Sequence, residues 1–132
     1  MKASKVEKEI IQTAHAPAAI GTYSQAVRAG NTVYVSGQIP LDPVTMQVVS
    51  DDFKAQTEQV LKNLSAVAEA AGGSLKDFVK INVYLTDLKD FGIVNEMMAL
   101  FFSKPYPARA AVQISALPRG VKVEIEGVMI LE

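Results

Sequence analysis

The chain has 132 residues, the size of one domain, and we expect residues 1–132 to form a single domain. The formal net charge is −1 and no run of Lys or Arg occurs, which argues against a dedicated nucleic-acid-binding protein. The absence of cysteine excludes disulfides and thiolate catalysis, and with one histidine we expect no metal site. No apolar stretch predicts a membrane span or a signal peptide, so the expected location is the cytoplasm.

The first half of the chain predicts short strands followed by one long helix. Strand-forming residues bounded by turn residues occur at 8–12, 24–29, 32–39 and 46–49. The Gly30-Asn31 dipeptide predicts a hairpin turn between the second and third of these strands. Apolar side chains recur at helical spacing through 52–71, and Gly72-Gly73 end this helix.

The second half predicts a strand, a helix and two further strands. Residues 78–85 alternate between apolar and polar side chains, as a half-buried strand does. An apolar stripe runs through 88–102, and the prolines that follow end this helix. Two strands are predicted at 109–115 and 121–131. The order βββ-α-β-α-ββ predicts an α+β fold in which two helices pack on one face of a sheet.

Alternation also divides each strand between two faces. We expect the helices to cover the apolar face, formed by Val33, Val35, Ala110, Val112, Ile114, Val123 and Ile125. The second face then carries Tyr34, Ser36, Gln38, Arg109, Ala111, Gln113, Lys122, Glu124 and Glu126, followed by Val128 and Ile130. Such a face is either partly buried against another subunit or an ordinary solvated face with two stray aliphatic residues, and the pattern favours neither.

One arginine and two glutamates are the charged candidates for chemistry. Arg109 starts a predicted strand, and its guanidinium offers two parallel N–H donors that match a carboxylate. A surface ion pair, with Glu124 or another acid, is the simpler interpretation of the same arginine. Glu124 can orient water or transfer protons, or it can belong to a solvated strand of alternating Glu and Lys. Glu126 fits the second interpretation equally well, so spacing does not choose between them.

Several uncharged residues are weaker candidates. The Tyr23 hydroxyl can bind a ligand or be satisfied within the packed protein. Ser36 and Gly37 combine a hydroxyl with a backbone that a ligand can approach, although glycine in a strand also marks a bulge. Asn95 is a poor helix former within a predicted helix, so a cap, a backbone contact or a ligand holds it there. His15 is expected to be structural or exposed, which leaves a Ser-His-Asp triad with little support.

Five segments, in order along the chain, resemble the RidA (YjgF-type) family. They are A-P-A-A-I-G-T-Y-S-Q-A-V at 16–27, V-S-G-Q-I-P at 35–40, the run from L-T-D-L to V-N at 85–95, P-A-R-A-A-V at 107–112, and V-K-V-E-I-E-G at 121–127. Each motif alone is weak, but together they cover nearly the whole chain. The resemblance implies a chorismate-mutase-like α+β fold with a mixed sheet, and a homotrimer with its active sites between subunits.

The resemblance also implies an activity without a cofactor. It is the hydrolysis of 2-imino acids, such as 2-iminopropanoate and 2-iminobutanoate, and of their enamine tautomers to 2-keto acids and ammonia. The family's carboxylate-binding arginine matches Arg109, and the glutamate credited with holding the attacking water matches Glu124. Further cleft positions match Tyr23, Ser36, Gly37, Asn95 and Ala111, the last through its backbone N–H.

Two points remain open at this stage. Thr22 stands where many members have proline before the cleft tyrosine, so the rigidity of the entrance loop is unsettled. The alternative functions are an endoribonuclease or translation inhibitor, attributed to some relatives, and a non-catalytic module that binds small carboxylates. The acidic pI of about 5.8 argues against the first, and Arg109 is retained where non-catalytic relatives lack it.

Overall fold

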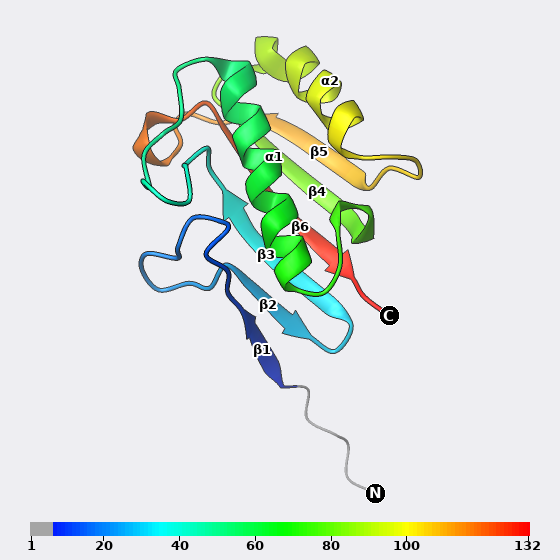
Figure 1. The fold of residues 1–132 in the computed structure, drawn as a ribbon. Helices are drawn as coiled ribbons and strands as arrows, with labels where there is room; N and C mark the ends of the chain where they lie inside the picture. Colours follow the sequence, from blue (N-terminus) through cyan, green and yellow to red (C-terminus); the bar gives the residue numbers. More distant parts are fainter. Residues whose placement is uncertain (1–6) are drawn as a thin grey trace, which may run out of the picture.

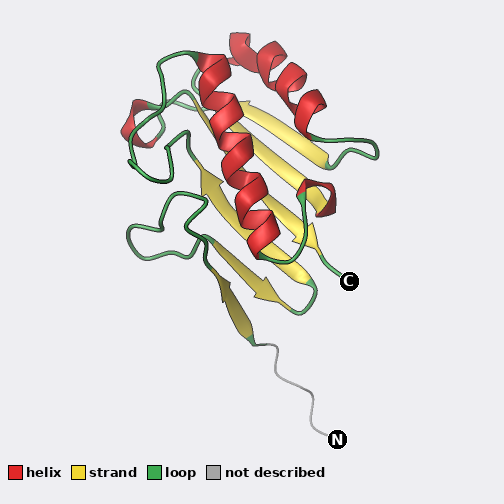
Figure 2. Ribbon diagram, in the orientation of Figure 1, coloured by secondary structure: helices red, strands yellow, loops and turns green. Residues whose placement is uncertain are grey.

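The computed structural model describes residues 7–132 and contains one mixed sheet with two helices on one side of it (Figures 1 and 2). The strands are β1 (Lys8–Ile11), β2 (Ala26–Ala29), β3 (Thr32–Gln38), β4 (Phe78–Leu85), β5 (Ala108–Gln113) and β6 (Val123–Ile130). The helices are α1 (Phe53–Ala70) and α2 (Phe91–Phe101), with 3₁₀ turns at Leu75–Asp77, Leu88–Asp90 and Pro118–Gly120. The predicted α+β class and element order are confirmed.

The sheet has the strand order β1-β2-β3-β6-β4-β5. Neighbouring strands are antiparallel except β4 and β5, which run parallel. The last strand of the chain, β6, therefore lies at the centre, and β5 forms one edge of the sheet (Figure 1). This order places the V-E-I-E segment of β6 between the S-G-Q segment of β3 and the alternating residues of β4.

Helix α1 covers the middle of the sheet and closes the core. Its start is capped by Asp52, whose carboxylate accepts a hydrogen bond from the Ala55 N–H at 2.9 Å. Gly72, at a φ of +96°, lies just beyond its end, where a left-handed residue lets the chain turn away. Leu61 and Leu64 are fully buried, and α1 lies against β3, β6 and α2. Within residues 7–132, no helix has both the length and the hydropathy of a membrane span.

The strand predicted near residues 46–49 is wrong. That segment makes one isolated bridge, between Leu41 and Val48. The Asp42 carboxylate accepts hydrogen bonds from two backbone N–H groups at 2.8 and 3.0 Å, which folds the segment into a turn. A local side-chain acceptor has therefore replaced the strand pairing that the sequence pattern indicates.

The prediction that Arg109 and Ala111 lie on the face away from the helices is also wrong. In the register of β4 and β5, Arg109 pairs with Ile81, and Ala111 pairs with Val83. Ile81 and Val83 are fully buried under the helices, and paired residues project from the same face. The alternate residues of β5 face the other way, and Val112 is 46% exposed. Because β5 is an edge strand with small alanines on both sides, its alternation does not indicate which face is buried.

We call the face opposite the helices the open face. On β6 it carries Glu124 and Glu126, followed by Val128 and Ile130, all partly exposed or exposed. Tyr34 on β3 adds a side chain that is 56% exposed. The predicted mixture of polar and aliphatic residues on this face is confirmed for β3 and β6, and both helices lie on the other side (Figure 2).

Candidate active site

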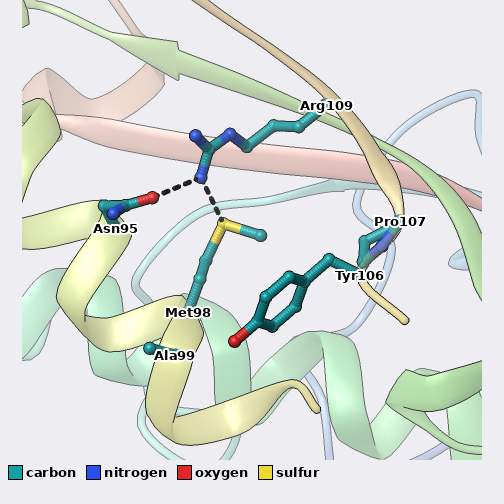
Figure 3. A pocket seen from close by; sticks show the side chains of 6 residues that line it. All are labelled: Asn95, Met98, Ala99, Tyr106, Pro107 and Arg109. Atoms are coloured by element: carbon teal, nitrogen blue, oxygen red, sulfur yellow. Dashed lines mark hydrogen bonds between the residues drawn. The ribbon is translucent and has the colours of Figure 1, made fainter. Parts of the chain in front are cut away.

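Arg109 projects from the edge strand β5 toward helix α2 (Figure 3). Its Nη1 atom donates hydrogen bonds to Asn95 Oδ1 at 3.0 Å and to Met98 Sδ at 3.6 Å. The guanidinium carbon lies 4.8 Å from the centroid of the Phe91 ring, a cation–π distance. Among the described residues, no acidic side chain forms a salt bridge with Arg109, so the alternative interpretation, a surface ion pair with Glu124 or another acid, is wrong. The remaining guanidinium donors are available to an anion.

A cavity of about 310 Å³ adjoins the arginine. It is lined by Asn95, Met98, Ala99, Tyr106, Pro107 and Arg109 (Figure 3). Helix α2 and the segment before β5 form the wall of this cavity. The wall is largely apolar, and the Arg109 guanidinium is the one charged group among the six lining residues. Such a cavity suits a small anion with a short carbon skeleton.

Asn95 has a physical reason to occupy the middle of α2. Its side chain is exposed to the cavity, and its Oδ1 atom accepts the hydrogen bond from Arg109. The asparagine thus holds the guanidinium by an oxygen that carries no full charge, which leaves the positive charge unneutralised. The sequence indicated that something holds Asn95 within the helix, and that partner is Arg109.

Glu124 lies on the open face, against a bulge in β3. The register of β3 with β6 shifts between Val35 and Gln38, and the glutamate carboxylate occupies the space that a side chain on Gly37 would fill. The same shift turns Gln38 into the interior, which corrects its predicted place on the open face. Burial, followed by repulsion from Glu126, raises the pKa of Glu124 above its usual value.

The two glutamates of β6 differ in their hydrogen bonds. Glu126 Oε2 accepts hydrogen bonds from Asn82 Nδ2 at 3.2 Å and from Tyr84 Oη at 3.1 Å. Within residues 7–132, no hydrogen bond engages the Glu124 carboxylate. The structure therefore distinguishes residues that sequence spacing could not, and Glu124 is the carboxylate free to contact a ligand or water.

Tyr23 lies on a loop at residues 13–25 and is 54% exposed. Its hydroxyl oxygen accepts a hydrogen bond from the Ile20 N–H at 3.3 Å. It lines one depression together with Gly37 and Arg119 and another together with Ser36 and Glu126. Tyr23 thus lies beside the β3 bulge that contacts Glu124.

Gln25 was not singled out by the sequence, yet it organises this loop. Its side chain is buried; its Oε1 accepts from the Thr13 N–H at 2.7 Å, and its Nε2 donates to the carbonyls of Thr13, Ala16 and Pro17 at 2.8–3.3 Å. One amide therefore satisfies backbone groups that would otherwise be buried without partners. A lone glutamine in a loop rich in Pro and Gly gives no periodic signal, so no pattern could have identified it.

Ser36 has a structural contact in this chain. Its hydroxyl donates a hydrogen bond to the Ser24 carbonyl, and its backbone N–H donates to the Gln25 carbonyl at 3.0 Å. Ser36 therefore ties β3 to the loop that carries Tyr23. His15 is exposed, and residues 7–132 contain no group of three or more side chains suited to hold a metal ion.

The predicted site residues form two separate clusters within one chain. Arg109, Asn95 and Ala111 lie on the helix-covered face at the edge of the sheet. A second cluster lies at the centre of the open face and consists of Tyr23, Ser36, Gly37 and Glu124. The cavity that Arg109 lines does not include Glu124. The sheet itself separates the cation from the carboxylate.

Comparisons with known proteins agree along nearly the whole chain. Residues 13–131 match the family described as Endoribonuclease L-PSP. A 2-iminobutanoate/2-iminopropanoate deaminase of Mus musculus is 46% identical over 127 residues, which cover 96% of this chain and 94% of that relative.

Solved structures give the same assignment. RidA from an Antarctic Psychrobacter species has a TM-score of 0.90 at 59% identity, covering 93% of this chain and 99% of that one. Escherichia coli TdcF with bound serine has a TM-score of 0.89 at 42% identity, covering 94% of this chain and 99% of that one. Matches of this identity and extent confirm the chorismate-mutase-like fold, and the chain belongs to the RidA/YjgF/L-PSP family.

Proposed function

We propose that this protein is a hydrolytic deaminase that converts 2-imino acids, such as 2-iminopropanoate and 2-iminobutanoate, and their enamine tautomers to 2-keto acids and ammonia. The observation that carries the proposal is Arg109, which Asn95, Met98 and Phe91 hold beside a small cavity with its charge unneutralised. A fixed guanidinium is the group best suited to bind the carboxylate of such a substrate. The name of the mouse relative and the serine bound by TdcF are consistent with a small amino-acid-like ligand.

The separation of the two clusters supports an active site between subunits. In a homotrimer, as the family resemblance implies, Arg109 of one subunit would approach Glu124 of another. The open face offers a surface for such contact, because it exposes Tyr34, Val112 and Ile130 beside its polar groups. An isolated chain would then carry two incomplete halves of the site and need its neighbours for turnover.

The proposed reaction begins with the carboxylate held by two parallel N–H donors of Arg109. Glu124 orients a water molecule toward the C=N carbon and takes the proton that the water releases as it adds. The nitrogen receives that proton, which gives a neutral tetrahedral carbinolamine. The carbinolamine hydroxyl proton then passes to the nitrogen as the C–N bond breaks and the C=O bond forms. The products are a 2-keto acid and ammonia, and the atoms balance without a cofactor.

The remaining residues have supporting roles in this proposal. Gly37 leaves room for the Glu124 carboxylate, and the Ala111 backbone N–H is a donor on the side of Arg109. Tyr23 provides a hydroxyl near the water. Ser36 and Asn95, expected to contact the substrate, act at least in part by fixing the loop and the guanidinium.

The decisive test uses Arg109→Ala with Arg109→Lys as the matched control. The imine is generated in place by an amino-acid oxidase, and the acceleration of its hydrolysis is measured. We expect the alanine variant to fold and assemble but to lose more than tenfold in kcat/KM, since a charge-assisted bidentate contact is worth about 2–4 kcal/mol. Arg109→Lys keeps the positive charge but loses the two parallel N–H donors of the guanidinium. Its kcat/KM should therefore lie between those of the wild type and Arg109→Ala. Near-normal turnover by Arg109→Ala would refute the proposal.

Endoribonuclease activity is the second candidate, because the matching family is described by that name. The net charge of −1 and the glutamates on the open face are unfavourable for binding a polyanion. Purified protein incubated with RNA tests it, with Arg109→Ala in parallel. Degradation that matches the wild-type rate in the variant would point to another site or a contaminant. A binding module without catalysis would bind 2-ketobutyrate in calorimetry and leave imine hydrolysis at its spontaneous rate.

A further inference from the structure

Four side chains form two cross-strand pairs on the open face. In the antiparallel register of β4 and β6, Tyr84 lies opposite Glu124 and Asn82 lies opposite Glu126. Yet the Tyr84 hydroxyl does not bond to the residue opposite it. It reaches diagonally to Glu126 Oε2 at 3.1 Å, the same oxygen that accepts from Asn82 at 3.2 Å. Both donors on β4 therefore converge on one glutamate and leave the other without a partner.

This arrangement fixes Glu126. Two donors on one carboxylate oxygen restrict the side chain to one place. Glu124 projects from the same face two residues away, a separation of about 6.6 Å along a strand. At that distance, and partly shielded from water, a fixed negative charge makes it harder for Glu124 to become negative as well.

We propose that Glu126, fixed by Asn82 and Tyr84 on the same face, is a positioning residue that prepares Glu124 to accept the proton of the attacking water and to return it to the nitrogen. The inference rests on the proposed deaminase function and extends it to a residue that does not touch the substrate. In the balanced sequence, Glu124 takes a proton from water as the water oxygen bonds to the C=N carbon, and passes that proton to the nitrogen. It then relays the carbinolamine hydroxyl proton to the nitrogen as the C–N bond breaks and ammonia leaves. As a stronger base, Glu124 accepts the proton from water more readily. Its protonated form can still donate a proton to the nitrogen.

The titration behaviour of the cluster agrees with this geometry. Burial and then the charge of Glu126 raise the pKa of Glu124. Burial and then the hydrogen bond to Glu126 raise the pKa of Tyr84, which keeps its hydroxyl protonated as a donor. The shift on Glu124 therefore has the sign that the hydrogen-bond pattern requires.

Other charged groups on this face do not cancel the effect. Lys80 on β4 lies opposite Val128, beyond Glu126 as seen from Glu124. Lys122, which precedes β6, donates its Nζ proton to the Asp51 carbonyl. In the proposed trimer, Arg109 of the partner subunit faces Glu124, and the bound substrate carboxylate offsets that positive charge.

The test compares Glu126→Gln with Glu69→Gln. Glu69 is an exposed residue of α1, on the other face of the sheet, so its replacement controls for the loss of one negative charge. The titration of Glu124 is followed in the assembled protein by NMR of carbon-13-labelled glutamate carboxyls, with Glu124→Gln to assign the signal. We expect Glu126→Gln to lower the midpoint of the Glu124 titration, and Glu69→Gln to leave it unchanged.

Kinetics provide the second readout. The acid limb of the kcat/KM profile should move to lower pH in Glu126→Gln by the same amount as the NMR midpoint. Its plateau should fall by about three- to tenfold, since a weaker base accelerates proton transfer less. Tyr84→Phe, which removes one of the two hydrogen bonds, should shift both readouts in the same direction by a smaller amount. A residue that served only to stabilise the fold would move neither.

The outcomes separate the two proposals. If the wild type hydrolyses imines but Glu126→Gln leaves the Glu124 midpoint and the acid limb in place, the role of Glu126 is wrong and the deaminase function stands. If the wild type does not accelerate imine hydrolysis, the deaminase function is wrong, whatever the NMR titration reports. A midpoint that rises in Glu126→Gln overturns the inference directly.

Discussion

The two faces of the sheet differ in the kinds of side chain that they carry. The face under α1 and α2 is largely apolar, and its Ile81, Val83 and Ile125 side chains are fully buried. The open face mixes carboxylates, tyrosines and exposed aliphatic side chains, and its hydrogen bonds are confined to a few pairs. The comparison teaches that one face maintains the fold, whereas the other leaves polar and apolar side chains together at the surface.

The largest expected effect is on stability, when one aliphatic side chain is removed from each face in turn. Leu64→Ala removes a fully buried side chain from α1 and should lower the free energy of unfolding by about 2–5 kcal/mol. Ile130→Ala removes a side chain of the open face that is 44% exposed, and should cost under about 1 kcal/mol. Urea denaturation of both variants and the wild type at one protein concentration measures both losses. Equal losses would break the distinction between the two faces.

The next prediction concerns the glycine that contacts Glu124. A side chain at Gly37 would overlap the Glu124 carboxylate, so Gly37→Ala should displace that group and lower imine hydrolysis by more than tenfold. Stability should change by less than about 1 kcal/mol, because the displaced atoms are the end of a flexible side chain. Gly92→Ala is the control, since a Cβ there meets nothing within 4 Å. Full activity in Gly37→Ala would remove Glu124 from the site.

The smallest effect is a pH dependence of stability. The folded-state pKa of Glu124 is raised above the ordinary value of 4.5, so the unfolded chain releases this proton first. The protein therefore loses stability as pH rises from about 4.5 through the folded-state pKa. Glu124→Gln lacks that loss, so its stability relative to the wild type should increase between about pH 4 and pH 7. Urea denaturation of both proteins at about pH 4 and pH 7 measures this change in relative stability. If the stability of Glu124→Gln relative to the wild type stays constant or falls between these pH values, the raised pKa of Glu124 is contradicted.

The sequence predicted most of the helix-covered face because that face obeys simple periodicity. The stripe of α1 and the alternation of β4 each match the buried residues, and the element order is confirmed. Prediction failed where the periodicity of the sequence does not indicate which face is buried or whether a strand forms at all. The alanines of β5 allowed its two faces to be exchanged, and the Asp42 turn replaced a strand at residues 46–49.

The candidate site was predictable in its residues but not in its geometry. Arg109 and Glu124 were identified by their motifs, whereas their placement on opposite faces depends on the parallel register of β5. Spacing alone could not choose between Glu124 and Glu126, and the choice of Glu124 came from the family resemblance. The structure adds a physical difference between the two, the diagonal hydrogen bond of Tyr84 to Glu126. Gln25 was missed because a buried amide that bonds a loop leaves no periodic trace.

The hydrogen bonds of Gln25 affect how the loop at residues 13–25, which carries Tyr23, can move. Residues 13–25 are fastened largely by one side chain rather than by a strand ladder, so this segment can open as a small cooperative unit while the sheet stays intact. Thr22, which leaves its backbone freer than a proline would, permits that freedom. Amide protons of the segment should therefore exchange with solvent ahead of those in β3 and β6, and access to Tyr23 would be governed by a local equilibrium separate from global unfolding.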